Sequence, residues 1–228
     1  MKKYSIHEVA ATIDHAVLKP NQTEVDVQDN AKTCIEYGVA SMCVRPCDVK
    51  LAAVLLKNSE VRVSCVLSFP HGDDTTAVKV FQAEQAISDG VQEIDMVMNI
   101  GQFLSGNYDY VLNDIRAVVE IAHSNGVLVK VIQESCFLTL EEVARASELS
   151  QQAGADFVKT STGFGPSAAT PEIIDVMIKT VGEKTGIKAS GGIRTWDQAI
   201  GYLEQGATRL GIGSTKTVLE GGVSNENY

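Results

Sequence analysis

Residues 155–168 read Ala-Asp-Phe-Val-Lys-Thr-Ser-Thr-Gly-Phe-Gly-Pro-Ser-Ala, and this stretch decides how the rest of the chain is interpreted. A short apolar strand is predicted over residues 156–158, and it runs directly into Lys159, three hydroxyl residues and a glycine-rich loop. Burying an ammonium group without a partner is costly, so a lysine in this position is favoured in its neutral form. A neutral lysine is a nucleophile that forms Schiff bases with carbonyl compounds. The alternative is a lysine that extends its charged end into water from the end of a strand.

The composition indicates one globular α/β domain. Of the 228 residues, 44% are hydrophobic and 21% are charged, which suffices for a large core and is too apolar for a disordered chain. The formal net charge of −10 argues against nucleic acid and anionic membranes as partners, because both attract basic surfaces. A small phosphate ester stays compatible with this charge, since it needs only a local positive pocket.

The cysteines and the N-terminal residues indicate a reducing compartment. The five cysteines are odd in number, and only Cys43 and Cys47 are close in sequence, without the second close pair of a structural zinc site. The start of the chain lacks the apolar segment of a signal peptide, and no membrane span is visible in the sequence. A cytoplasmic location is therefore expected.

Segments of strand and helix character alternate along the chain. A short first helix over residues 5–11 is predicted by Ser5 with Glu8 three residues later, which is the pattern of a capping box. Strands are predicted at residues 12–18, 39–44, 62–69, 93–98, 127–132, 156–158, 187–190 and 208–212. Further helices are predicted at residues 24–37, 47–56, 76–88, 108–124, 140–153, 171–185, 195–205 and 215–219.

Eight strand–helix units at this spacing predict an α/β fold, a (β/α)8 TIM barrel with a short extra N-terminal helix. Strands such as 63–67 are continuous apolar runs, as expected when both faces of a sheet are covered. An open doubly wound sheet is the competing fold, but the first strand lacks a GxGxxG turn and ionisable residues occur on consecutive strands. We therefore expect one barrel domain over residues 1–219 and a flexible C-terminal tail over residues 220–228, whose glycines and polar residues have little to bury.

Four ionisable residues interrupt the apolar strands at positions that alternation assigns to the barrel interior. If Lys159 points inward, the same choice for Asp95, Lys130 and Lys188 leaves their apolar neighbours facing the helices. Lysines gathered in a small volume are expected to lower one another's pKa, while an aspartate among them offsets part of the charge and can relay protons. A structural ion-pair network is the alternative interpretation.

Glycines follow the last three predicted strands and suggest a phosphate site. They are Gly163, the pair Gly191 and Gly192, and Gly213 with Ser214 beside it. Phosphate sites in barrels favour these loops, where backbone N–H groups and a helix N-terminus supply positive charge. Ordinary tight turns between strand and helix are the alternative for each glycine.

The histidines give no clear metal motif. His15 and His71 end the first and third predicted strands, but no HxH or HExxH spacing supports a metal pair. We expect these histidines to orient neighbouring loops, with Asp14 in a supporting position beside His15.

Six segments, in order along nearly the whole chain, resemble the deoxyribose-phosphate aldolase family. They are Ile-Asp-His-Ala-Val-Leu-Lys-Pro (13–20), Ser-Phe-Pro-His-Gly (68–72), Glu-Ile-Asp-Met-Val-Met-Asn-Ile-Gly (93–101), Val-Lys-Thr-Ser-Thr-Gly-Phe (158–164), Lys-Ala-Ser-Gly-Gly-Ile-Arg (188–194) and Gly-Ile-Gly-Ser (211–214). The resemblance implies a class I aldolase on a (β/α)8 barrel. Such an enzyme is a lyase of deoxyribonucleotide catabolism that reversibly cleaves 2-deoxy-D-ribose 5-phosphate to D-glyceraldehyde 3-phosphate and acetaldehyde, without a metal or another cofactor.

The resemblance also implies roles for individual residues. Lys159 matches the Schiff-base lysine, Asp95 the acid/base of proton transfer, and Lys188 the lysine that perturbs Lys159. Lys130 matches a further active-site lysine that contacts substrate. Phosphate-binding positions are matched by Gly192, Gly213 and Ser214, and Gly163 joins them through its place in the loop after the sixth strand.

Two departures from the family pattern concern loops. Gln133 stands before Glu134-Ser135, where the family usually has an apolar residue before Glu-Thr. Phe164 stands where relatives can have lysine, so phosphate binding would depend more on backbone groups here.

Two other functions remain as alternatives, namely another phosphosugar aldolase or isomerase, or a catalytically silent phosphosugar-binding protein. The presence of all four ionisable residues of the barrel interior disfavours a catalytically silent protein. The sequence leaves the oligomeric state open between a homodimer and a homotetramer. A last hypothesis is that Tyr228 reaches the active-site mouth and assists proton transfer, against the alternative of an inert chain end.

Overall fold

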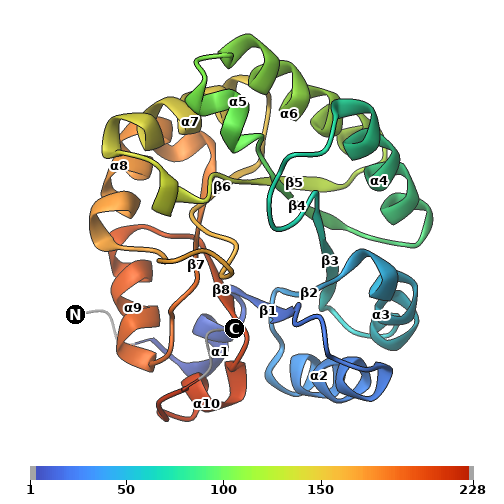
Figure 1. Ribbon diagram of the computed structural model, residues 1–228. Helices are drawn as coiled ribbons and strands as arrows, with labels where there is room; N and C mark the ends of the chain where they lie inside the picture. The colour runs from blue at the N-terminus through green and yellow to red at the C-terminus, as the bar shows by residue number, and fades with distance from the viewer. Residues whose placement is uncertain (1–3, 226–228) are drawn as a thin grey trace.

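The computed structural model describes residues 4–225, and these form a closed barrel of eight parallel strands. Each strand pairs with the next in sequence, and β8 pairs with β1 to close the barrel. Figure 1 looks into the barrel, with the strands at the centre and the helices around them. The (β/α)8 barrel with a short N-terminal helix is confirmed.

The strands are short and regularly spaced. They are β1 (Ile13–Val17), β2 (Ser41–Val44), β3 (Arg62–Leu67), β4 (Glu93–Val97), β5 (Leu128–Ile132), β6 (Phe157–Lys159), β7 (Gly186–Ser190) and β8 (Arg209–Ile212). The α-helices are α1 (Ile6–Ala10), α2 (Glu24–Tyr37), α3 (Val49–Leu56), α4 (Thr76–Ser88), α5 (Ile100–Leu104), α6 (Tyr108–His123), α7 (Leu140–Gln152), α8 (Pro171–Val181), α9 (Trp196–Gln205) and α10 (Thr215–Leu219). Three 3-10 turns complete the described elements: η1 (Pro46–Asp48), η2 (Ser135–Phe137) and η3 (Gly182–Lys184).

Most predicted segments recur within one to three residues, and the differences have local causes. The helix predicted over residues 47–56 is divided into η1, with Pro46 in its first turn, and α3. The helix predicted over residues 171–185 ends at Val181, because Gly182 leaves helical geometry with φ at 59°. Helix α5 was not predicted, although Asn99 caps it by accepting from the N–H of Gln102. Lys159 is the last residue of β6 and not the residue after it.

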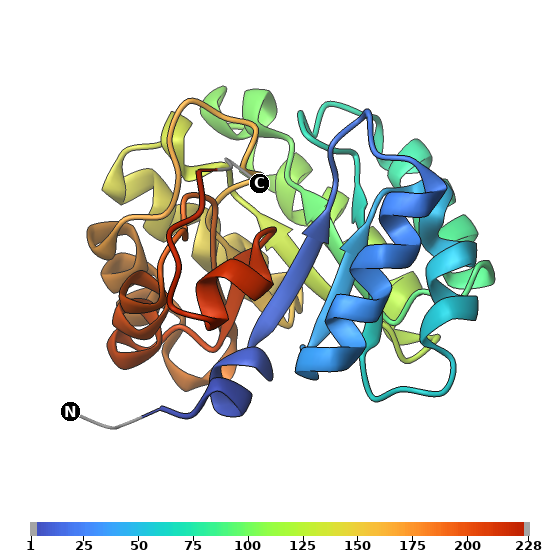
Figure 2. The same cartoon turned by 90° about the horizontal axis from the view of Figure 1, so that it is seen from below.

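The predicted capping box at the start of the chain is confirmed. The Ser5 hydroxyl accepts from the N–H of Glu8, and the Glu8 carboxylate accepts from the N–H of Ser5, so α1 begins at Ile6. Figure 2 shows α1 near the amino-terminal end of β1, opposite the loops that follow the strands. The carboxyl ends of the strands are therefore the open side of the barrel, where active sites of this fold lie.

The apolar core lies mainly between the strands and the helices. Residues that point outward from the strands, such as Ile94, Met96 and Val131, are fully buried against the helix layer. A second, smaller apolar cluster of Ala16, Leu18, Cys43 and Val66 comes from the first three strands and packs with Phe69. Alternation places this cluster inside the barrel, so the apolar side of the lumen is built by β1–β3.

The described part of the C-terminal tail lies along the rim. Gly222 N donates to Thr217 O, and Ser224 N donates to Arg194 O at 3.0 Å. The Ser224 and Ser214 hydroxyls are 2.6 Å apart. Flexibility of residues 220–228 stays a prediction, and the hypothesis on Tyr228 falls outside the described residues. Within residues 4–225, no helix is long and apolar enough to cross a membrane.

Candidate active site

Strand register brings the four predicted wall residues to neighbouring positions. Asp95 of β4 lies beside Lys130 of β5, and Lys159 of β6 lies beside Lys188 of β7. All four side chains are almost completely buried. Because parallel strands share one direction, their inward side chains meet in the middle of the lumen.

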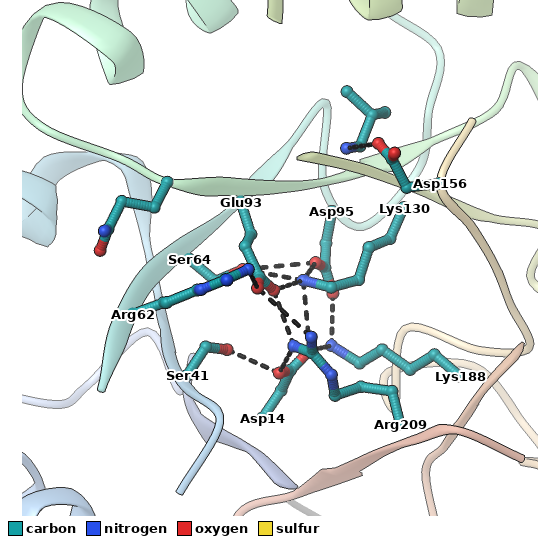
Figure 3. Close-up of polar contacts among 12 residues, drawn as sticks. Asp14, Ser41, Arg62, Ser64, Glu93, Asp95, Lys130, Asp156, Lys188 and Arg209 are labelled. Atoms are coloured by element: carbon teal, nitrogen blue, oxygen red, sulfur yellow. Dashed lines mark hydrogen bonds and ion pairs between the residues drawn. The ribbon is translucent and has the colours of Figure 1, made fainter. Parts of the chain in front are cut away.

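Asp95 is the centre of this group. Its Oδ2 atom lies 2.8 Å from Lys159 Nζ and 2.6 Å from Lys188 Nζ. Its Oδ1 atom lies 2.8 Å from Lys130 Nζ and also accepts from the Ser64 hydroxyl at 3.3 Å. One carboxylate therefore connects all three lysines, and Figure 3 shows Asp95 between Lys130 and Lys188. The sequence predicted this convergence.

Three further charged residues enlarge the group beyond what the sequence predicted. Glu93 precedes Asp95 by two residues on β4, and its Oε2 atom lies 2.6 Å from Lys130 Nζ. Arg209 of β8 reaches Glu93 Oε2 at 2.7 Å and Asp14 Oδ1 at 2.5 Å. Asp14 of β1 also pairs with Lys188 and accepts from the Ser41 hydroxyl at 2.6 Å. We call these seven residues the lumen cluster: Asp14, Glu93, Asp95, Lys130, Lys159, Lys188 and Arg209.

The spacing in the sequence carried a signal for Glu93, since residues two apart on a strand share one face. Arg209 gave no such signal, because its partners belong to strands that are distant in sequence. Asp14, expected in a supporting position, points into the lumen cluster, where it contacts Lys188 and Arg209.

Burial and charge act in opposite directions on these groups. Burial alone would favour the neutral acids, but Lys130, Lys159 and Lys188 outweigh it and hold the pKa of Asp95 well below its ordinary value. Burial is likewise outweighed at Asp14, whose pKa is lowered by Lys130, Lys188 and Arg209. Both carboxylates are therefore ionised at neutral pH.

The expectation that clustered lysines lower one another's pKa is wrong for Lys130. Burial disfavours its ammonium form, but Asp14, Asp95 and Glu93 together outweigh burial and raise the pKa of Lys130. The expectation counted one carboxylate among the lysines, whereas three surround Lys130. Lys130 is thus a permanent cation of the cluster.

The end of β6 offers polar atoms beside Lys159. The Thr160 hydroxyl lies 3.1 Å from both the carbonyl and the N–H of Ser190, which joins the ends of β6 and β7. Within residues 4–225, the buried hydroxyls of Ser161 and Ser190 have no hydrogen-bond partner. Buried hydroxyls ordinarily find a partner, so these two are available to a polar ligand at the open end of the barrel.

The predicted phosphate loops converge at the same end. Gly163 and Gly192 have φ values of 87° and 71°, which favour glycine. Gly191 has φ at 82°, and a Cβ there would lie 3.0 Å from the Cβ of Ala168 and 3.6 Å from the Cα of Gly163. The loops after β6 and β7 are therefore in contact, and glycine permits this approach.

Gly213 and Ser214 lie in the third loop. They line a polar cleft of about 430 Å³ between the β1–α2 loop, α2 and α10. The tail connects this loop with the previous one, because Ser224 contacts both Ser214 and Arg194. All four predicted phosphate-site residues are thus found at the open end, in three adjacent loops.

The two departures from the family pattern have clear positions. Gln133 is buried and its Nε2 atom donates to the Ser147 hydroxyl of α7 at 2.8 Å, so it joins the loop to the helix layer. Phe164 packs edge to face on Phe69, with ring centroids 5.3 Å apart. It also lines an apolar pocket of about 310 Å³ that includes Phe137, Pro166 and His71.

The loop after β5 is held by Glu134. Glu134 is buried, has φ at 43°, and pairs with the hydroxyl of Thr162. It also accepts from the N–H of Thr162 at 3.3 Å. This carboxylate therefore fixes the loop that follows Lys159.

The histidines occupy separate positions. His15 Nε2 lies 2.6 Å from Asn30 Oδ1, and His15 Nδ1 lies 2.8 Å from the Thr215 hydroxyl. Both ring nitrogens are thus used between β1, α2 and α10, while His71 lines the apolar pocket at the mouth. Among residues 4–225, no group of three or more His, Cys, Asp or Glu side chains is arranged to hold a metal ion.

Comparisons with known proteins agree with this arrangement. Residues 8–221 match the model of a family described as DeoC/LacD family aldolase. The chain is 49% identical over 216 residues to a deoxyribose-phosphate aldolase from Thermococcus gammatolerans, covering 94% of this chain and 96% of that protein. It is 47% identical to a deoxyribose-phosphate aldolase from Clostridium perfringens strain 13, covering 97% and 98%.

A solved structure extends the comparison to three dimensions. A deoxyribose phosphate aldolase from Aeropyrum pernix, described as a unique tetrameric structure, is 30% identical and superimposes with a TM-score of 0.89 over 95% of this chain and 91% of that one. The family match covers nearly all of the barrel and includes every residue of the lumen cluster. The chain belongs to the DeoC/LacD family of aldolases.

Proposed function

We propose that this chain is a deoxyribose-phosphate aldolase that cleaves 2-deoxy-D-ribose 5-phosphate through a Schiff base on Lys159. The observation that carries the proposal is the position of Lys159, buried at the open end of the barrel and 2.8 Å from a carboxylate that also binds Lys188. Such an arrangement supplies a nucleophile and a proton relay at one point. The activity of the homologous aldolases supports the choice of substrate.

The reaction starts at the aldehyde carbon C1 of the open-chain sugar. Neutral Lys159 attacks C1, and loss of water from the resulting carbinolamine gives an iminium ion. A proton then leaves the C3 hydroxyl as the C2–C3 bond breaks. The bonding electrons flow into the iminium group, giving an enamine on Lys159 and free glyceraldehyde 3-phosphate. Only cleavage between C2 and C3 leaves the electrons conjugated with the nitrogen.

Asp95 and Lys188 transfer the protons in these steps. Asp95 is ionised, so it can accept a proton in the step that breaks the C2–C3 bond. Lys188 lies 2.6 Å from the same carboxylate oxygen and can pass the proton onward. Protonation of the enamine at C2 gives the iminium ion of acetaldehyde, and hydrolysis releases acetaldehyde and restores Lys159. Lys130 stays a cation throughout and holds Asp95 in place.

The phosphate end of the substrate fits the loops after β6, β7 and β8. Backbone N–H groups near Gly163, Gly192 and Gly213, with the Ser214 hydroxyl, would hold it. The unpartnered hydroxyls of Ser161 and Ser190 support binding of a polar ligand between this rim and Lys159.

The expected location, partners and oligomeric state of the protein follow from the same proposal. A metabolic aldolase acting on a phosphosugar is expected in the cytoplasm, in deoxyribonucleotide catabolism, without nucleic-acid or membrane partners. The tetrameric relative from Aeropyrum pernix supports a homo-oligomer for this chain, either a homodimer or a homotetramer.

The direct test is product formation from 2-deoxy-D-ribose 5-phosphate. We expect glyceraldehyde 3-phosphate and acetaldehyde in equal amounts, and an unchanged rate after prolonged chelation, because the iminium ion is the electron sink that a metal supplies in other aldolases. Absence of both products would contradict the proposal. Loss of activity on chelation, with recovery on adding zinc, would contradict its Schiff-base chemistry.

A further inference from the structure

The lumen cluster contains unequal numbers of positive and negative groups. Its cations are Lys130, Lys159, Lys188 and Arg209, and its carboxylates are Asp14, Glu93 and Asp95. If every group were ionised, four positive charges would face three negative charges. An uncompensated charge is costly away from water, so the loss of one proton is favoured.

The contacts indicate which cation loses its proton. Lys130 pairs with three carboxylates, and Lys188 pairs with Asp14 and Asp95. Arg209 pairs with two carboxylates and stays charged because guanidinium groups do not deprotonate in proteins. Among the described residues, Lys159 pairs with one carboxylate, Asp95, and shares that oxygen with Lys188. Lys159 therefore loses least when it becomes neutral.

Among the described residues, no other strand supplies a charge that changes this comparison of the four cations. The β2 residue near the lysines is Cys43, and burial raises the pKa of its thiol, so it stays neutral. Glu134 in the loop after β5 pairs with Thr162. Arg62 of β3 reaches Glu93 at 3.2 Å, but its side chain is 51% exposed, so water and salt screen its charge.

Arg209 is held in place by dedicated contacts. Its guanidinium lies 5.1 Å from the centre of the Phe157 ring, in cation–π geometry. The ring in turn needs glycine beside it, because a Cβ at Gly186 would lie 2.4 Å from its atoms. Arg209 is paired beside Lys188 in the β7–β8 register and does not contact Lys159. It is therefore a candidate positioning residue that acts through charge.

We propose that Arg209 is the fixed fourth cation that leaves the lumen cluster one positive charge in excess and thereby keeps Lys159 neutral for attack on the substrate aldehyde. Glu93 has the opposite effect, because it compensates one of the four cations. The inference rests on the Schiff-base function proposed for Lys159 and assigns what sets the charge of that lysine.

The test measures the pH dependence of imine formation in matched variants. Each protein is mixed with acetaldehyde and cyanoborohydride across a pH series, and the rate at which the reduced adduct appears on Lys159 is followed by mass spectrometry. Removing the excess charge in Arg209→Met should move the pH midpoint upward by about one unit or more, the size expected for one unit charge in a partly buried cluster. Glu93→Gln leaves two excess charges and should move the midpoint downward.

The double variant separates charge from structure. Arg209→Met with Glu93→Gln leaves three lysines and two carboxylates, again one charge in excess, so its midpoint should return close to that of the original protein. Arg209→Lys keeps the charge and should keep the midpoint. Arg62→Met removes the half-exposed arginine on the same carboxylate and should give a much smaller shift than Arg209→Met.

The experiment distinguishes failure of the role proposed for Arg209 from failure of the proposed function. If the original protein forms no adduct on Lys159 at any pH, the function itself is wrong. If it forms the adduct and Arg209→Met has the same midpoint, the role of Arg209 is wrong. Should Arg209→Met fail to fold, Glu93→Gln still decides, because a midpoint that stays the same or moves upward in this variant would overturn the proposal.

Discussion

At the scale of single residues, Lys159 forms its ion pair with one oxygen atom, Asp95 Oδ2, which it shares with Lys188. Asp95 Oδ2 accepts from Lys159 and Lys188, so the two ammonium groups compete for it. Lys188 has Asp14 as a second carboxylate, whereas Lys159 has Asp95 alone among the described partners. The two lysines therefore differ in the number of carboxylates that they contact.

Replacing Lys188 tests this asymmetry. Lys188→Leu removes one cation and one arm of the proton relay, so we expect turnover to fall by at least about 100-fold. The pH at which imine forms on Lys159 should rise, because three carboxylates then face three cations. The measurement is the pH dependence of both turnover and adduct formation.

Lys184→Leu is the matched control, since Lys184 is exposed at the turn before β7 and touches none of the lumen cluster. It should leave both pH profiles unchanged. A Lys188→Leu enzyme with the original pH profile would show that Lys188 does not influence Lys159.

The sequence revealed those residues that interrupt apolar strands. Lys130 and Asp95 are polar residues inside otherwise apolar runs, and strand alternation then gave their direction. Arg209 begins its strand, where a charged residue is ordinarily solvated, so the sequence alone did not single it out. Arg209 meets Asp14 across 195 positions of sequence, and only closure of the barrel between β8 and β1 brings them together.

At the scale of elements, the sequence predicted what local chemistry determines. Ser5 with Glu8 marked helix α1, and the capping box is present. Thr23 and Thr139 cap helices α2 and α7 in the same way. The five-residue helix α5 was not predicted, because so short a helix has too few residues for a periodic pattern. The sequence also did not predict the buried ion pair of Lys79 on α4 and Asp114 on α6, whose charged atoms lie 2.6 Å apart. Charged residues on a helix usually face water.

His15 joins three elements, and its titration should affect stability. Burial lowers the pKa of His15 below its ordinary value of 6.5, with Asn30 opposing this shift. The folded protein therefore binds fewer protons than the unfolded chain as the pH falls below about 6.5. Stability is complete above this pH and declines below it, by at most about 1.4 kcal/mol per pH unit until the folded pKa is reached.

The measurement is the free energy of unfolding in denaturant at pH 7.5 and 5.5. His15→Gln retains polar atoms toward Asn30 and Thr215 but does not titrate, so it should lose less stability between the two pH values than the original protein. Equal losses would show that His15 does not contribute to the pH dependence.

At the scale of the whole molecule, the fold arises from eight similar units that only a closed barrel can bring together. The repeated strand–helix spacing predicted the architecture, and the continuous apolar strands indicated that both sheet faces are covered. What the sequence could not give is the register between strands that are distant in the chain, and the charge balance inside the barrel depends on it.

The molecule as a whole is acidic, whereas its lumen is not. Its formal net charge is −10, but the lumen cluster contains more cations than carboxylates. The lumen is thus less acidic than the molecule as a whole, below the end of the barrel where a substrate with a phosphate group is expected to bind.

Trapping the intermediate tests most directly whether Lys159 forms the Schiff base. The protein is incubated with acetaldehyde, reduced with borohydride, digested and mapped by mass spectrometry. We expect an added ethyl group on Lys159 and none on Lys130 or Lys188, which each contact more than one carboxylate. An ethyl group on another lysine of the lumen cluster, or none on Lys159, would contradict this expectation.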